Sequence, residues 1–201
     1  MRLINTSTGL FEEFVGRNIP KYAILSHTWE EEEVSFEAMT NDPSFRSMKG
    51  YQKIKMTCHM ASQAGYCFVW IDTCCIDKSS SAELTEAINS MYRWYQRSEI
   101  CYVFLSDLPA SAALNALQGC RWFTRGWTLQ ELLAPASVEF FAKDGQYLGD
   151  KQSLEQDIHQ ITSVSWCLVA DVIIRLTGAA SASMPKTTSP PLNQFPIHLP
   201  E

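Results

Sequence analysis

The feature that most constrains the fold is an alternation of short apolar runs with longer, helix-type segments. Four runs are almost wholly apolar, as are strands that helices cover on both faces, and they lie at residues 22–26, 67–72, 100–105 and 138–141. A strand–helix–strand–helix order predicts an α/β fold with a mostly parallel sheet covered by helices. Right-handed crossovers would then place the loops that follow the strands along one edge, where such folds bind ligands.

The segments between the first three runs carry helix signals of their own. An apolar i, i+4, i+7 pattern begins at Ile54, and Gly65 stands where a glycine would end that helix. A wide apolar stripe covers residues 83–97, and Ser80 with Glu83 forms a capping-box pattern at its start. We therefore expect two helices between these three strands.

Polar side chains follow the first two predicted strands. Ser26, His27 and Trp29 come after the first strand, and Asp72 ends the second. His27 is compatible with a hydrogen-bonded structural role or with a contact to a phosphate or base. Asp72 is compatible with capping its loop or with binding a sugar hydroxyl. The acidic run at residues 30–33 is typical of a solvated helix start.

Glu131 leaves two interpretations open. The pattern Thr128-x-x-Glu131 is a capping box that would stabilise a short helix by about 1 kcal/mol and needs no ligand. Two tryptophans and two arginines also lie nearby in the sequence, at Trp122, Trp127, Arg121 and Arg125. A carboxylate in such an apolar, cation-lined pocket can stabilise positive charge that develops in a transition state.

Composition excludes several classes of function. With 201 residues and 46% apolar content, the chain can bury one core. A net charge of −6 offers no basic field for nucleic acid. Neither a glycine-rich phosphate loop nor a metal-ligand spacing of cysteines and histidines is present in the sequence, so we expect no nucleotide hydrolysis at such a loop and no metal site.

Cysteine usage and hydropathy bear on location. Seven cysteines, an odd number, fall mostly in segments that read as core, and the N-terminus turns polar at once. Both features favour a reduced, cytoplasmic protein over a disulfide scaffold. The apolar stretch at residues 164–176 is shorter than the roughly 20 residues of a membrane-spanning helix, so we expect no membrane span.

Three segments together resemble the fungal heterokaryon-incompatibility (HET) domain. They are residues 22–29 (YAILSHTW), 65–78 (GYCFVWIDTCCIDK) and 125–135 (RGWTLQELLAP). The resemblance covers residues 1–162 and implies a flavodoxin-like fold similar to Toll/interleukin-receptor (TIR) domains. It further implies an effector of non-self recognition that triggers programmed cell death, a form of fungal innate immunity.

The TIR likeness also implies an enzymatic hypothesis. Some members of that wider group cleave NAD with a glutamate in a Trp-x-x-x-Glu helix, a pattern present at Trp127–Glu131. Glu131 is then the candidate catalytic residue of an NAD glycohydrolase, with NAD as substrate and no firm cofactor. The residues expected to line the NAD site are Ser26, His27, Trp29, Asp72 and Trp127.

The sequence leaves two alternatives to an enzyme open. A non-enzymatic adaptor would dock partner signalling domains or self-associate, with Glu131 serving only as a cap. An inactive relic is the second alternative, because the chain departs from the family pattern. Glu30 replaces a common glycine, an apolar segment of uncertain role fills residues 163–177, and a flexible Pro/Ser-rich tail is expected at 178–201. We interpret this end as truncated or altered.

Overall fold

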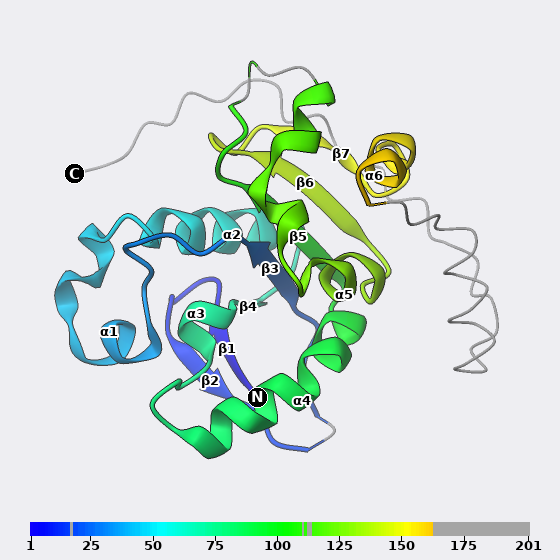
Figure 1. Ribbon diagram of the computed structural model, residues 1–201. Coiled ribbons are helices and arrows are strands. Elements are labelled where there is room, and N and C mark those ends of the chain that lie inside the picture. Colours follow the sequence, from blue (N-terminus) through cyan, green and yellow to red (C-terminus); the bar gives the residue numbers. More distant parts are fainter. Residues whose placement is uncertain (17, 110, 112–113, 163–201) are drawn as a thin grey trace. The chain divides into compact units, whose positions relative to one another are not determined.

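The computed structural model describes residues 1–16, 18–109, 111 and 114–162. The predicted apolar segment at 163–177 and the predicted tail at 178–201 lie outside these residues. The described chain forms one seven-stranded sheet with helices packed around it (Figure 1).

The strands are β1 (Arg2–Asn5), β2 (Phe11–Glu13), β3 (Ala23–His27), β4 (Phe68–Trp70), β5 (Ile100–Leu105), β6 (Val138–Ala142) and β7 (Tyr147–Asp150). The α-helices are α1 (Phe36–Asn41), α2 (Tyr51–Gln63), α3 (Asp72–Cys75), α4 (Ser81–Arg97), α5 (Thr128–Leu133) and α6 (Glu155–Thr162). Three 3-10 helices complete the set: η1 (Pro43–Ser47), η2 (Leu114–Gly119) and η3 (Arg121–Thr124).

The sheet is mixed, with strand order β2-β1-β4-β3-β5-β6-β7. The four strands predicted from the sequence are the central ones, and they pair in parallel as β4-β3-β5-β6. The β1–β2, β1–β4 and β6–β7 pairs are antiparallel. The α/β class is therefore confirmed, but the mostly parallel sheet is wrong: half of these six pairings are antiparallel. Short connections join β1 to β2 and β6 to β7, and such connections permit only antiparallel pairing.

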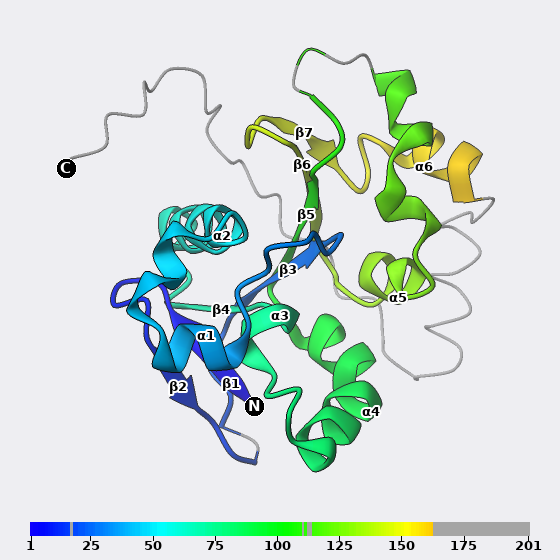
Figure 2. The ribbon, with the colours of Figure 1, turned by 60° about the vertical axis from the view of Figure 1, so that its left-hand side comes forward.

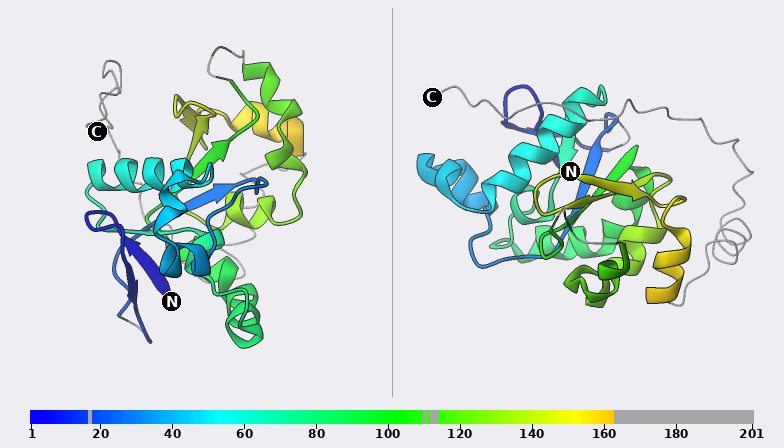
Figure 3. Two further views of the ribbon diagram at one scale, coloured as in Figure 1. Left: turned by 90° about the vertical axis from the view of Figure 1, so that its left-hand side faces the viewer. Right: turned by 90° about the horizontal axis from the view of Figure 1, so that it is seen from above.

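Helices lie on both faces of the sheet (Figures 2 and 3). The helix between β3 and β4, α2, lies on one face, whereas α4 and α5 lie side by side on the other. This division follows from the strand order, because the chain steps from β3 to β4 in one direction and then from β4 across to β5 in the other. The carboxyl ends of the parallel strands therefore point to one edge.

The core explains why the central strands read as apolar runs. All residues of β3 and β5 are buried, as expected for strands that helices cover on both faces. Trp70 of β4 packs edge-on against Trp94 and Tyr95 of α4. Trp122 packs edge-on against Phe140 of β6. These aromatic contacts fix the helices against the strands from which the polar residues project.

The two predicted helix-end signals behave differently. Gly65 ends α2 as predicted, with a φ of +84°. The N–H of Tyr66 donates to the carbonyl of Ala61, which makes this end a Schellman motif. Ser80 Oγ accepts the N–H of Glu83, which is half of the capping box. The Glu83 carboxylate instead accepts from the Asp77 N–H at 2.7 Å and from Arg2 at 2.9 Å.

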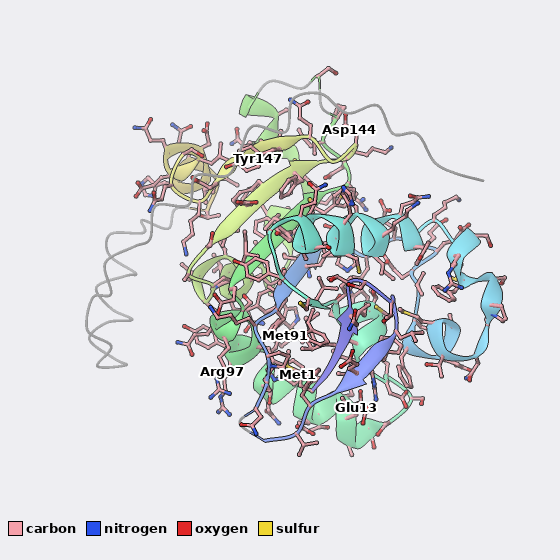
Figure 4. The ribbon with its side chains drawn as sticks, turned by 180° about the vertical axis from the view of Figure 1, so that it is seen from behind. Met1, Glu13, Met91, Arg97, Asp144 and Tyr147 are labelled. Atoms are coloured by element: carbon pink, nitrogen blue, oxygen red, sulfur yellow. The ribbon has the colours of Figure 1, made fainter. Side chains whose placement is uncertain are left out.

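The N-terminal hairpin of β1 and β2 is an addition to the parallel core (Figure 4, where Met1 and Glu13 mark its paired ends). Arg2 ties this hairpin to the helices. Its guanidinium pairs with Glu13 and Glu83, donates to the Cys75 carbonyl, and lies 3.9 Å from the ring centroid of Phe36. The hairpin is thereby fastened to α1, α3 and α4.

Candidate functional site

The candidate site is built on the last two residues of β3. Ser26 and His27 are buried, with exposed fractions of 1% and 2%. Because successive residues of a strand point to opposite faces, Ser26 faces α5 and His27 faces the side of α2. Each residue anchors its own cluster of polar side chains. The backbone of β3 joins the two clusters.

The Glu131 cluster consists of Ser26, Trp122, Arg125 and Glu131. Ser26 Oγ donates to Glu131 Oε2 at 2.5 Å, and the indole N–H of Trp122 donates to Ser26 Oγ at 2.7 Å. Arg125 forms a two-pronged ion pair with both carboxylate oxygens, at 2.9 and 3.0 Å. A short, bidentate arginine–carboxylate pair is among the strongest of side-chain hydrogen bonds. The carboxylate is thus fully engaged.

This geometry excludes the capping interpretation of Glu131. Residue Trp127 is the N-cap of α5, and no side chain caps that helix end. The hydroxyl of Thr128 donates to the Trp122 carbonyl at 2.5 Å instead of accepting from the helix. Glu131 points into the protein, with 3% of its side chain exposed, toward a strand more than 100 residues away in sequence. Of the two arginines suggested by the sequence, Arg125 is the one that pairs with it.

The His27 cluster consists of His27, Trp29, Asp72 and Lys78. One oxygen of Asp72 lies 3.1 Å from His27 Nε2, and the other accepts the Trp29 indole N–H at 2.8 Å. A carboxylate only accepts, so His27 carries a proton on Nε2. Lys78 Nζ lies 3.7 Å from the ring centroid of Trp29, a cation–π contact. Three of the sequence-predicted site residues are therefore brought together here.

Electrostatics in the His27 cluster favour an ionised acid. Burial by itself raises the pKa of Asp72, but the hydrogen bond and charge of His27 and the hydrogen bond of Trp29 outweigh it, so the pKa lies below its usual value. The pKa of Lys78 also lies below its usual value, because burial lowers it by more than the charge of Asp72 raises it. The buried acid thus holds a half-exposed indole in a fixed orientation.

The sequence analysis did not predict the ion pair of Glu33 with Lys53, which lies beside His27. The acidic run predicted as a solvated helix start is a loop, and α1 begins only at Phe36. Within it, Glu33 forms an ion pair with Lys53 of α2, and Lys53 also lies 3.4 Å from the Thr28 carbonyl. Glu33 Oε1 stands 3.8 Å from His27 Nδ1, a buried nitrogen without a hydrogen-bond partner in the described chain. A lysine at an inward position of the helical pattern was the available signal.

Trp127, the last of the predicted site residues, lies outside both clusters, as do Arg121 and Cys74. Trp127 is half-exposed at the start of α5, where its carbonyl accepts the N–H groups of Gln130 and Glu131. Arg121 reaches toward Glu30 and Asp107 at the surface. Cys74 is buried, and burial raises the pKa of its thiol well above the usual value, so it is not an activated nucleophile.

Two hollows of the described surface lie away from these clusters. One, of about 470 Å³, is lined by residues around Tyr22 and Arg97, where β3 begins. A second, of about 350 Å³, lies between the loop at residues 6–9 and α2. Glu131 is closed off in this conformation, because only 3% of its side chain is exposed. Among the described residues, no helix combines the length and apolar character needed to cross a membrane.

Comparison with known proteins identifies the family. Residues 22–120 match the model of the family described as "Heterokaryon incompatibility protein (HET)". The chain is also 51% identical, over 156 residues, to "Vegetative incompatibility protein HET-E-1" of Podospora anserina. The chain belongs to the HET-domain family. The family model covers both Ser26 and the His27 cluster.

The aligned length limits which properties of the Podospora protein can be assigned to this chain. The alignment covers 73% of this chain but only 11% of the Podospora protein, so the chain matches a small part of that relative. No solved structure matches the chain. The HET family and its link to incompatibility thus rest on sequence, and the geometry of Glu131 has to be argued from this structure alone.

Proposed function

We propose that this HET domain is a cytoplasmic effector of heterokaryon incompatibility that triggers cell death by cleaving NAD, with Glu131 as its catalytic carboxylate. The observation that carries the proposal is the direct contact between Glu131 and Ser26 at 2.5 Å. It brings the third sequence motif to the carboxyl end of a central parallel strand, the edge at which α/β sheets bind ligands. The TIR likeness inferred from the sequence belongs to the same proposal.

The chemistry asked of Glu131 is stabilisation of positive charge. Breaking the bond between ribose C1′ and the nicotinamide nitrogen returns the electron pair to the positively charged ring and releases neutral nicotinamide. The ribose acquires oxocarbenium-like charge, which a nearby carboxylate stabilises. Water then adds to C1′ and loses a proton, giving ADP-ribose. The half-exposed Trp29, held by Asp72, would flank the substrate at the same edge.

Expression in cells tests this proposal. Wild type should deplete NAD and kill, whereas Glu131→Gln should do neither, because the amide keeps the shape but removes the charge. Glu86→Gln, at an exposed position of α4, is the matched control and should behave as wild type. NAD loss and death that persist in a folded Glu131→Gln variant would overturn the catalytic role of Glu131.

A non-enzymatic adaptor is the second candidate, and exposed apolar side chains favour it. Ile88 and Tyr92 lie one turn apart on α4 with exposed fractions of 46% and 39%. Trp127, the N-cap of neighbouring α5, and Leu129 within α5 are also exposed. Exposed apolar groups on neighbouring helices suit docking of a partner domain or a second copy. An adaptor predicts killing that survives Glu131→Gln but is lost in Ile88→Lys and retained in Gln96→Lys.

A further inference from the structure

Glu131 cannot meet a substrate while its present partners hold it. Its side chain is 3% exposed, and Ser26 and Arg125 between them engage both oxygens. A buried acid is not released at will, because removing the one cation from a buried pair is strongly destabilising. Any opening of the site therefore needs another group to satisfy the acid, the cation or both.

Arg125 is the partner placed to leave. Ser26 and Trp122 are buried in β3 and η3, whereas 22% of the Arg125 side chain is exposed. Arg125 lies in the turn between η3 and α5. The outer side of that turn is open: a Cβ added to Gly126 would meet nothing within 4 Å, and Trp127 is 47% exposed. The guanidinium can thus swing toward solvent without moving a strand.

The chemistry of the guanidinium indicates which group can replace Glu131 as the partner of Arg125. Arginine binds carboxylates and phosphates with the same two-pronged geometry, so a phosphate group can replace the carboxylate without loss of hydrogen bonds. The substrate of the proposed reaction is a dinucleotide with two phosphates. We propose that Arg125 is a latch on Glu131: a phosphate group of the substrate takes over Arg125, and the positively charged nicotinamide ring replaces the guanidinium beside the carboxylate. This inference rests on the proposed function.

The test uses Trp122 as a reporter, because its indole N–H donates to Ser26, which in turn donates to Glu131. The full chain is labelled with ¹⁵N-tryptophan and titrated with inorganic pyrophosphate. The Trp122 indole signal should shift saturably, while that of core Trp70 stays fixed. Potassium chloride at equal ionic strength should move neither. An unmoved Trp122 signal in the folded wild type overturns the latch.

Variants separate the latch from general anion binding. Arg125→Lys keeps the positive charge but loses the two-pronged geometry of the guanidinium. The pyrophosphate affinity reported by the Trp122 signal and the apparent affinity for NAD should each fall by roughly tenfold. This is the loss expected from one charge-assisted hydrogen bond. Arg46→Lys is the control and should respond as wild type. A folded Arg125→Lys variant with wild-type response refutes the latch. The titration needs no catalysis, so an active Glu131→Gln variant would refute the proposed function alone.

Discussion

The two clusters on the opposite faces of β3 each bury a carboxylate, but they stabilise it with different partners. Each holds one buried carboxylate, Glu131 or Asp72. Glu131 is neutralised by a permanent cation, Arg125, and sealed, whereas Asp72 is held by an imidazole and by an indole that is half-exposed. The first is a strong, closed pair that needs a trigger, and the second is an open arrangement that presents an aromatic ring. We infer that control and recognition are divided between the faces.

The largest effect is expected from breaking the Glu131 pair. Arg125→Met leaves a buried charge without its cationic partner and should lower the free energy of unfolding by about 3–5 kcal/mol. Combining Arg125→Met with Glu131→Gln should recover most of this loss, since no charge remains buried. Urea unfolding of both single variants and the double variant gives the coupling energy. Additive losses would mean that the pair is not coupled.

A smaller loss is expected when Asp72 becomes neutral. Asp72→Asn weakens the bonds from His27 and Trp29 and should cost about 1–3 kcal/mol at pH 7. The folded-state pKa of Asp72 is lowered, so its contribution is present above the unfolded value and is lost as pH falls through the folded one. The gap between variant and wild type should therefore shrink below about pH 4. Unfolding curves across that range would contradict this if the gap stayed constant.

A comparable loss is expected at the loop that backs the His27 cluster. A Cβ added to Gly50 would lie 2.5 Å from the Glu32 carbonyl oxygen and 2.9 Å from the Glu33 Cα, both backbone atoms that cannot rotate away. Gly50→Ala should cost about 1–3 kcal/mol by overpacking. Gly126→Ala, where the added carbon meets nothing within 4 Å, is the matched control. Equal melting temperatures for the two variants would refute the tight contact.

The smallest effect is expected at the exposed ring of the open cluster. Trp29→Phe removes the indole N–H that Asp72 accepts but keeps an aromatic face for Lys78. One hydrogen bond is lost, so the unfolding free energy should fall by only about 1 kcal/mol. If the ring helps to bind the substrate, the KM for NAD should rise more than stability falls. A variant whose KM is unchanged would leave Trp29 with a structural role alone.

The sequence predicted the central strands well because they are buried on both faces and hence continuously apolar. It missed β1, β2 and β7 because they are short and partly polar, as in Phe11–Glu13, where two of three residues are acidic. The missed strands pair antiparallel to their neighbours, which is why the predicted sheet was too parallel.

The sequence predicted which residues belong to the candidate site better than it predicted how they are arranged in space. Proximity in sequence suggested Arg125 and Trp122 as neighbours of Glu131, and both belong to its cluster. The opposite orientations of Ser26 and His27 follow from strand geometry, but which helix each would meet depends on the crossovers. The inward position of Lys53 in its helix signals a buried partner, but no local pattern shows that this partner is Glu33, 20 residues earlier.

NAD consumption by the purified chain tests the central claim most directly. Wild type and Glu131→Gln are compared after each has been shown to unfold cooperatively, with nicotinamide and ADP-ribose measured as products. The account predicts that wild type releases both products in equal amounts and that Glu131→Gln releases neither. Equal product release by the two proteins would contradict it.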